Sequence, residues 1–181
     1  LQWKKKKLLL TFLIVLKLYM PDITISETNT DRRYTIEDEE NVIRLLSIPS
    51  CLNSNGRLTP VAFSLYHNNE DYVSISRLFY SSRDECIELG KKIKVWASKG
   101  DEFAGLAELN AGKIRSISST QILLLSKYKE DLKAHAGISF KNENSDIYVN
   151  IKKGTPSPAW LIPLQQRLCL ISKVEKIDLK K

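Results

Sequence analysis

The stretch that decides the fold covers residues 58–78 and reads LTPVAFSLYHNNEDYVSISRL. Its two apolar runs are separated by the polar segment HNNED at 67–71, whose residues are typical of turns. The stretch therefore predicts a hairpin at the centre of the fold. The second run alternates at the period of a strand, with Tyr72, Ser74, Ser76 and Leu78 on one face and Val73, Ile75 and Arg77 on the other.

The flanking sequence predicts further strands, because apolar and β-branched residues recur there at period 2. The apolar run ILLLSKYK at 122–129 fits either a strand or a helix, and NAGK at 110–113 predicts a tight turn. Strands are expected over 42–48, 92–97, 103–109, 135–140 and 147–151, the last two as a second hairpin.

Two helices are expected as well. Ser82 and Glu85 form a capping box, in which each side chain satisfies a backbone donor of the first turn, so a helix is predicted over 83–91. Pro163 would break a helix interior, and the second helix is therefore expected to begin near it. Its apolar face would carry Leu164, Leu168, Ile171 and Val174.

The order of these elements predicts an α+β fold, with a mostly antiparallel sheet, one mid-chain helix and a C-terminal amphipathic helix. A chain of 181 residues has room for one domain with an ordinary core, which is expected over 42–174. Residues 20–41 are polar and predict a mobile arm, and residues 175–181 predict a basic tail.

The formal net charge of +7 is confined to the two ends of the chain. Residues 1–19 hold five lysines and no acid, and residues 173–181 hold four lysines and two acids. The 153 residues between them carry 19 basic and 19 acidic side chains. Nucleic-acid binding needs a basic surface on the folded body, so this distribution argues against a nucleic-acid partner.

The first nineteen residues, LQWKKKKLLLTFLIVLKLY, have three interpretations. A lysine run before the apolar segment from Leu8 to Leu16 resembles a signal peptide or anchor, which would make the protein exported or attached to a membrane. Alternatively, translation begins at Met20, the only methionine, and the protein is cytoplasmic. In the third interpretation the segment is a structural element of the fold.

Cys51, Cys86 and Cys169 are far apart in the chain. Three reduced thiols are expected, which suits a reducing compartment, and the alternative is a disulfide between two of them. The chain has two histidines and no clustered pattern of cysteine and histidine, so no metal is expected. Gly112 and Lys113 do not complete a P-loop, because the first glycine and the hydroxyl residue of that motif are missing. No nucleotide site of that kind is expected.

His135 stands in the apolar segment KAHAGISF. It could act as a general base or a hydrogen-bonding clamp; the alternative is a half-buried strand residue whose ring nitrogens bond to the backbone. Arg77 also has two interpretations. It is either an anion clamp or a buried structural partner of Asp101, Glu102 or Glu108.

Four short motifs resemble those of a family of small bacterial α+β proteins with no settled activity. The resemblance covers residues 42–172 and implies the fold, without a mechanism. The motifs are Ile43-Arg44-Leu45, the segment GRLTPVAF at 56–63, Val73-Ser74-Ile75 and His135-Ala136-Gly137-Ile138.

A second resemblance is to the ADP-ribosyltransferases. Arg44 in an early strand, Ser74 and Ser76 in a Ser-x-Ser strand and a following helix occur in the order of that fold. The resemblance implies that the arginine and the serine hold NAD and that a glutamate acts on the ribose. The chain lacks the Glu-x-Glu of those enzymes, and only Glu108 or Glu143 could replace it.

Two functions follow from the sequence. The first is a small bacterial domain without catalysis or cofactor, which binds an unidentified protein partner or belongs to an accessory cassette. The alternative is an ADP-ribosyltransferase-like enzyme that uses NAD. The enzyme requires Arg44, Ser74 and a glutamate to meet in one cleft, and the candidate site residues are Arg44, Ser74, Ser76 and His135.

Overall fold

The computed structural model has an α+β fold, with a six-stranded antiparallel sheet and three α-helices among the residues it describes. These residues belong to one compact unit that begins at Asp31. The predicted fold class is confirmed. The described residues are 31–65, 71–93, 100–145, 147–149 and 158–177.

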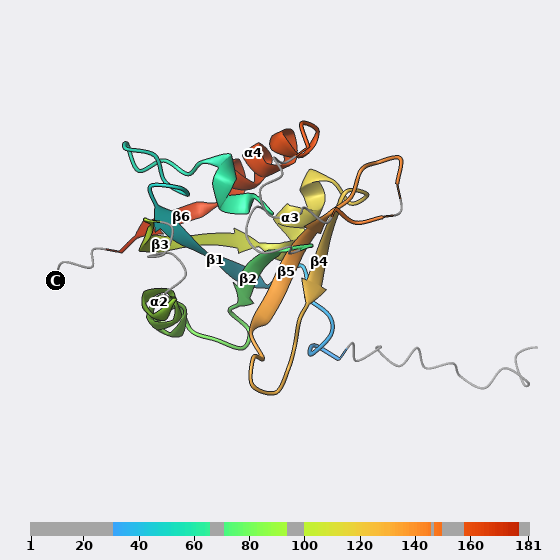
Figure 1. Cartoon of the computed structure of the whole chain (residues 1–181). Helices are drawn as coiled ribbons and strands as arrows, with labels where there is room; N and C mark the ends of the chain where they lie inside the picture. Colours follow the sequence, from blue (N-terminus) through green and yellow to red (C-terminus); the bar gives the residue numbers. More distant parts are fainter. Residues whose placement is uncertain (1–30, 66–70, 94–99, 146, 150–157, 178–181) are drawn as a thin grey trace, which may run out of the picture. The chain divides into compact units, whose positions relative to one another are not determined.

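The strands of the sheet run in the order β4-β5-β2-β1-β3-β6, and every neighbouring pair is antiparallel (Figure 1). The predicted strands over 42–48, 72–78, 103–109 and 135–140 are confirmed, and the ambiguous run at 122–129 is a strand. The bounds are β1 Asn41–Ile48, β2 Val73–Arg77, β3 Glu102–Asn110, β4 Ile122–Ser126, β5 His135–Phe140 and β6 Lys173–Lys176.

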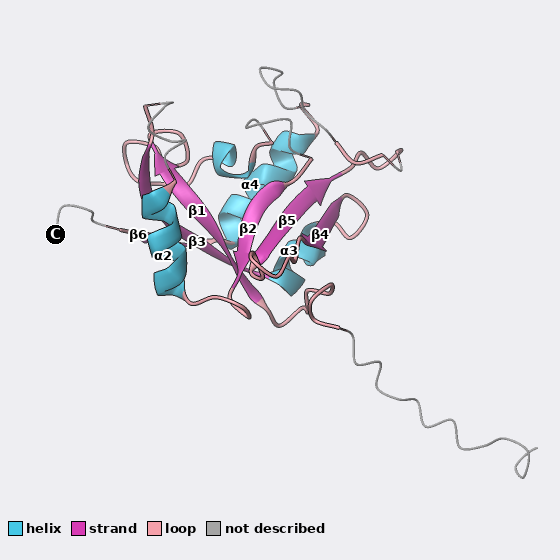
Figure 2. Cartoon of the chain, turned by 60° about the horizontal axis from the view of Figure 1, so that its bottom comes forward, coloured by secondary structure: helices cyan, strands magenta, loops and turns pink. Residues whose placement is uncertain are grey.

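Helices cover both faces of the sheet. The α4 face carries the larger core, which is closed by the 3-10 helix η1 (Pro60–Phe63) and the helices α3 (Ala111–Ile117) and α4 (Leu161–Ile171). The α2 face carries a smaller core under helix α2 (Arg83–Lys92). Helix α2 packs on β1 and β3 (Figure 2). Since cross-strand partners share a face, the register assigns each strand residue to one of the two faces.

The sequence correctly locates the start of α2. The Ser82 hydroxyl accepts a hydrogen bond from the Glu85 amide at 3.2 Å, and the Glu85 carboxylate accepts from the Ser82 amide at 2.7 Å. These two bonds complete the predicted capping box. The helix ends at Lys92, inside the segment expected to be a strand, and residues 94–99 of that segment lie outside the described residues.

The predicted central hairpin is wrong. Its first apolar run forms η1, because a proline such as Pro60 is favoured at the start of a helix. Ala62 and Phe63 of this helix are buried. Strand β2 instead pairs with β1 and β5. The polar segment 66–70 lies outside the described residues.

The predicted tight turn at 110–113 is also wrong. The Asn110 side chain accepts a hydrogen bond from the Lys113 amide at 3.1 Å and caps α3. In both a helix N-cap and a turn, an asparagine side chain accepts a hydrogen bond from a backbone amide a few residues later. Local sequence therefore does not distinguish a helix start from a turn at this position.

The C-terminal helix differs from its prediction at both ends. It begins at Leu161, with Pro163 in the first turn, where a backbone N–H has no intrahelical acceptor. It ends at Ile171, and Val174 lies in β6 instead of continuing the apolar face. In the second predicted hairpin, Tyr148 pairs with Lys141, and residues 150 and 151 lie outside the described residues.

Residues 31–41, the last part of the segment predicted to be a mobile arm, lie in the compact unit. Ile36 is buried in the larger core. The amides of Ala111 and Gly112 donate to the carbonyls of Glu40 and Asp38 at 2.9 and 3.0 Å. The remainder of the predicted arm, the first nineteen residues and most of the basic tail lie outside the described residues. In the part of the chain that is described, no helix has the length and apolar character needed to cross a membrane.

The register between β1 and β3 shifts next to Gly105. This glycine has a φ of +154°, and a Cβ added there would lie 2.1 Å from the carbonyl oxygen of Glu175 in β6. We expect Gly105→Ala to lower the free energy of unfolding by about 2–4 kcal/mol, because the cost of the strained backbone adds to the cost of the clash between the new Cβ and β6. Urea denaturation measures this loss.

The matched control is Gly100→Ala, since Gly100 also has a positive φ, +72°, but meets no atom within 4 Å of the added Cβ. It should cost only about 1 kcal/mol. Equal losses in the two variants would contradict the close packing of β6 on Gly105.

Candidate functional site

Arg44 lies where β1 and β2 separate. In β1 the residues that pair with β2 are Val42 and Ile43. Arg44 is the next residue of β1, and its guanidinium lies between η1 and β2. Its Nε donates to the carbonyl oxygen of Ala62 in η1 at 2.9 Å, and its Nη1 donates to the carbonyl oxygen of Ser74 at 2.9 Å. Arg44 therefore joins η1, β1 and β2 from the α4 face of the sheet.

Ser74 and His135 meet on the α2 face. They lie on the paired strands β2 and β5, and the Ser74 Oγ is 3.1 Å from the His135 Nε2. The pKa of His135 is lowered mainly by burial, and the charges of Lys127 and Lys129 lower it further. A neutral imidazole with its proton on Nδ1 can accept the hydroxyl proton of Ser74 at Nε2.

Aromatic and cationic groups surround this pair. The centroid of the Tyr72 ring is 5.7 Å from that of His135, and the Lys127 Nζ lies 4.5 Å from the Tyr72 centroid. Tyr72 can lie across β5 because Gly137 has no side chain: a Cβ there would approach the ring to 2.5 Å. Ser139 is buried, and its Oγ has no hydrogen-bond partner among the residues that the structure describes.

The chemistry of the Ser74–His135 pair is limited. A hydroxyl on a neutral imidazole has the geometry of general-base activation. Among the described residues, however, no carboxylate bonds to His135, so the third member of a catalytic triad is missing. The arrangement can hold a ligand through hydrogen bonding and ring contact.

One chain of hydrogen bonds joins the four motifs of the first resemblance. It runs from Ala62 to Arg44, from Arg44 to the Ser74 carbonyl, and from the Ser74 hydroxyl to His135. The motifs lie far apart in the sequence, in β1, η1, β2 and β5. Packing and strand connection therefore give each of these motifs a structural role.

The residues named for the NAD alternative do not converge. Arg44 lies opposite Ala107 on the α4 face, whereas Ser74 and Ser76 are on the α2 face. Glu108 is also on the α2 face, where it accepts hydrogen bonds from Asn41 and Arg83. Glu143 is exposed in the loop after β5. The cleft that this enzyme requires is not formed by these residues.

Arg77 is fully buried on the α4 face. Its Nε and Nη2 donate to the two carboxylate oxygens of Glu40 at 2.9 and 2.7 Å, and Glu40 is itself 6% exposed. Further donations go to the carbonyls of Arg32 at 2.7 Å and Thr35 at 2.8 Å and to the Ser126 hydroxyl at 3.3 Å. All bonds to Arg77 are therefore structural.

The structural interpretation of Arg77 holds, but the predicted partner is wrong. Asp101 bonds to the hydroxyls of Ser47 and Ser50, and Glu108 pairs with Arg83. Glu40 is favoured because it precedes β1, whose Val42 is the cross-strand partner of Arg77. The sequence shows an acidic residue, Glu40, just before β1. Only the pairing of β1 with β2 reveals that this residue lies next to Arg77.

The structure also contains a cluster of aromatic and arginine side chains that was not predicted from the sequence. Phe79 and Tyr80 follow β2, and their ring centroids are 4.8 Å apart. Tyr128 lies 5.7 Å from Tyr80 and 6.5 Å from Tyr34. We call the set of Arg32, Arg33, Tyr34, Phe79, Tyr80 and Tyr128 the aromatic–arginine surface.

Other reactive groups offer no site. The three cysteines are free thiols, and burial raises the pKa of Cys169 to about 11. Within the described ranges, no group of three His, Cys, Asp or Glu residues is placed to hold a metal ion.

Comparison of the chain with protein-family models, curated proteins and solved structures produced no match. The function is therefore argued from the geometry of the described residues.

The Arg77–Glu40 pair predicts a strong coupling energy. Arg77→Met should lower the free energy of unfolding by about 3–5 kcal/mol, because Glu40 and two carbonyls lose a buried donor. Arg77→Met combined with Glu40→Leu should cost less than the sum of the single changes. Chemical denaturation of the four proteins in the cycle measures this coupling.

The control is Arg83→Met, which breaks a half-buried ion pair to Glu108 and an exposed ion pair to Glu175. It should cost no more than about 1 kcal/mol. Additive losses for Arg77 and Glu40 would show that the pair is not coupled.

His135 predicts a pH effect. Its pKa is lower in the folded protein than in the unfolded chain, so the unfolded chain binds the proton more readily. The contribution of neutral, buried His135 to the stability of the folded protein is complete above about pH 6.5 and is lost as the pH falls below this value. His135→Gln should flatten the dependence of the melting temperature on pH between about 7 and 5, with His67→Gln as control. An unchanged slope in His135→Gln would contradict the burial of a neutral imidazole.

Proposed function

We propose that this protein binds a protein partner through the aromatic–arginine surface. The observation that carries the proposal is a set of four exposed or half-exposed aromatic rings from three chain segments that contact one another, three of which also contact arginine side chains. Tyrosine and arginine are enriched at the energetic centres of protein interfaces, whereas a single exposed ring is ordinary. Here the Tyr34 residue is 69% exposed and the Phe79 residue 47% exposed.

The surface is supported by a rigid base. The Arg77 guanidinium carbon lies 5.0 Å from the Tyr80 centroid and 6.0 Å from that of Phe79, and Glu40 accepts hydrogen bonds from the same guanidinium. The Arg32 guanidinium carbon lies 4.7 Å from the Phe79 centroid. Side chains that are already ordered lose less entropy on binding, which favours this surface as an interface.

The location of the protein belongs to the same proposal. We place it in a bacterial cytoplasm, where the three free thiols would stay reduced. The NAD alternative receives no support from the positions of its residues, because Arg44 lies on the α4 face and Ser74 and Glu108 lie on the α2 face.

Site-specific photo-cross-linking in the natural host tests the proposal. A photoreactive phenylalanine analogue at position 79 should give one discrete cross-linked protein. The same analogue at Leu170, which is 84% exposed on α4, is the control and should not give that product.

The captured protein is then purified and its affinity measured. Replacing Tyr34 and Phe79 together with serine should weaken binding at least about tenfold, as expected for truncated aromatic anchors. Leu170→Ser should leave the affinity unchanged. Cross-linking that is absent at position 79, or equal at the two positions, would refute the proposal.

A further inference from the structure

A pocket lies at the end of the sheet opposite to the aromatic–arginine surface. It has a volume of about 430 Å³ and is bordered by the loop after β1, the start of β3 and the end of β6. Its apolar lining includes Ile48, Leu52, Ala104 and Ile177. A size and an apolar lining of this kind are typical of small-molecule sites.

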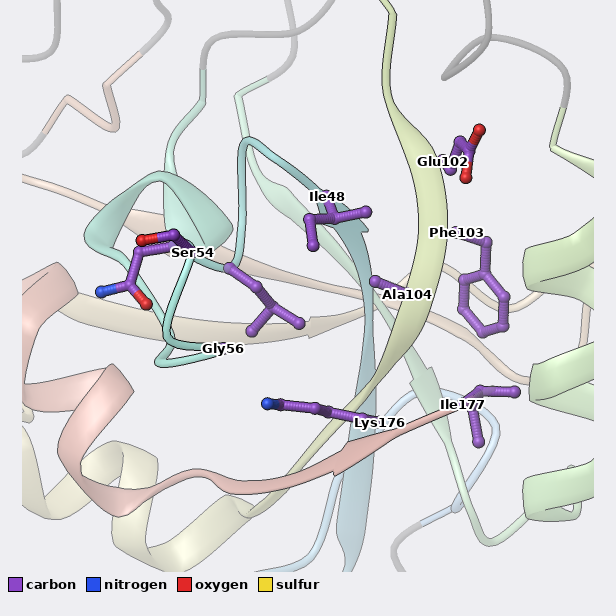
Figure 3. Close-up of a pocket in the computed structure, with 10 residues that line it drawn as sticks. Ile48, Ser54, Gly56, Glu102, Phe103, Ala104, Lys176 and Ile177 are labelled. Carbon is purple, nitrogen blue, oxygen red and sulfur yellow. The ribbon is translucent and has the colours of Figure 1, made fainter. Parts of the chain in front are cut away.

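Two opposite charges line the pocket without pairing with each other. Lys176 and Glu102 both border it, and neither forms an ion pair with any described residue. In Figure 3 Lys176 extends toward the loop that carries Ser54 and Gly56, and Glu102 lies at the opposite end. The pocket therefore has a cationic end, an apolar middle and an anionic end.

The end of the lysine side chain lies beside the loop. A Cβ on Gly56 would lie 1.8 Å from the Lys176 Nζ, so the ammonium lies close to the backbone of the loop. The loop is closed by Asn53, whose side chain accepts from the amides of Asn55 and Arg57 at 3.0 and 2.9 Å. The Asn53 carbonyl accepts from the Gly56 amide at 2.7 Å.

The wall behind the pocket is also ordered. Asp101 precedes Glu102 and is buried, and its carboxylate accepts hydrogen bonds from the hydroxyls of Ser47 and Ser50, each at 2.9 Å. These bonds join the start of β3 to the end of β1, from which Ile48 borders the pocket.

We propose that this pocket binds an aliphatic amino carboxylate. The carboxylate of the ligand would lie at Lys176, its ammonium group at Glu102, and its methylene chain against Ile48 and Ala104. A simple anion would meet the repulsion of Glu102, and a simple cation that of Lys176. A zwitterion with an apolar middle satisfies both charged ends and the lining between them.

NMR titration of the full chain tests this inference with three probes of equal chain length: 6-aminohexanoate, hexanoate and hexylamine. Only 6-aminohexanoate should shift the amide signals of Leu52, Gly56 and Ala104 at low concentration. We expect its affinity to exceed those of the other two by about fivefold or more, the factor typical of one added ion pair. Equal affinity for all three probes, or no saturable shift, would overturn the proposal.

Two variants assign the charged ends. Lys176→Met should remove the advantage of 6-aminohexanoate over hexylamine, and Glu102→Gln should remove its advantage over hexanoate. Lys173→Met, on the same strand but outside the pocket, should change neither ratio. Unchanged ratios in Lys176→Met or Glu102→Gln would show that the charges do not select the ligand.

Discussion

The pairing of a buried guanidinium with a buried carboxylate is the constraint on which much of this structure depends. Arg77 has no exposed surface, so each of its donors needs an acceptor inside the protein. Glu40 supplies two, and the backbone of residues 32 and 35 supplies two more. The segment before β1 is therefore bound to β2, and the rings of Phe79 and Tyr80 lie beside the same guanidinium.

Arg44 has a comparable role at the point where the sheet separates. Its guanidinium binds carbonyls of η1 and β2. Both arginines on the α4 face thus connect backbone segments. The Ser74–His135 pair lies on the other face of the sheet. This division places the side chains of Arg44 and Ser74 on opposite faces.

Patterns that depend on near neighbours in the sequence were predictable. Alternation placed Val73, Ile75 and Arg77 on the buried face of β2, and the capping box located α2. Features that depend on distant segments were not. The choice of Glu40 as partner required knowledge that β1 pairs with β2, and the aromatic–arginine surface combines three segments with no shared period. Local sequence also could not separate η1 from a short strand, because four apolar residues fit both.

The most direct test of this account is hydrogen exchange at the amides of Ala111 and Gly112, which donate to the carbonyls of Glu40 and Asp38. In the native protein they should exchange as slowly as the amides of β1, because the segment opens only with the sheet. In Arg77→Met their protection should fall while that of α2 persists. Rapid exchange in the unaltered protein, or equal protection in the variant, would contradict the claim that Arg77 and Glu40 hold this segment in the fold.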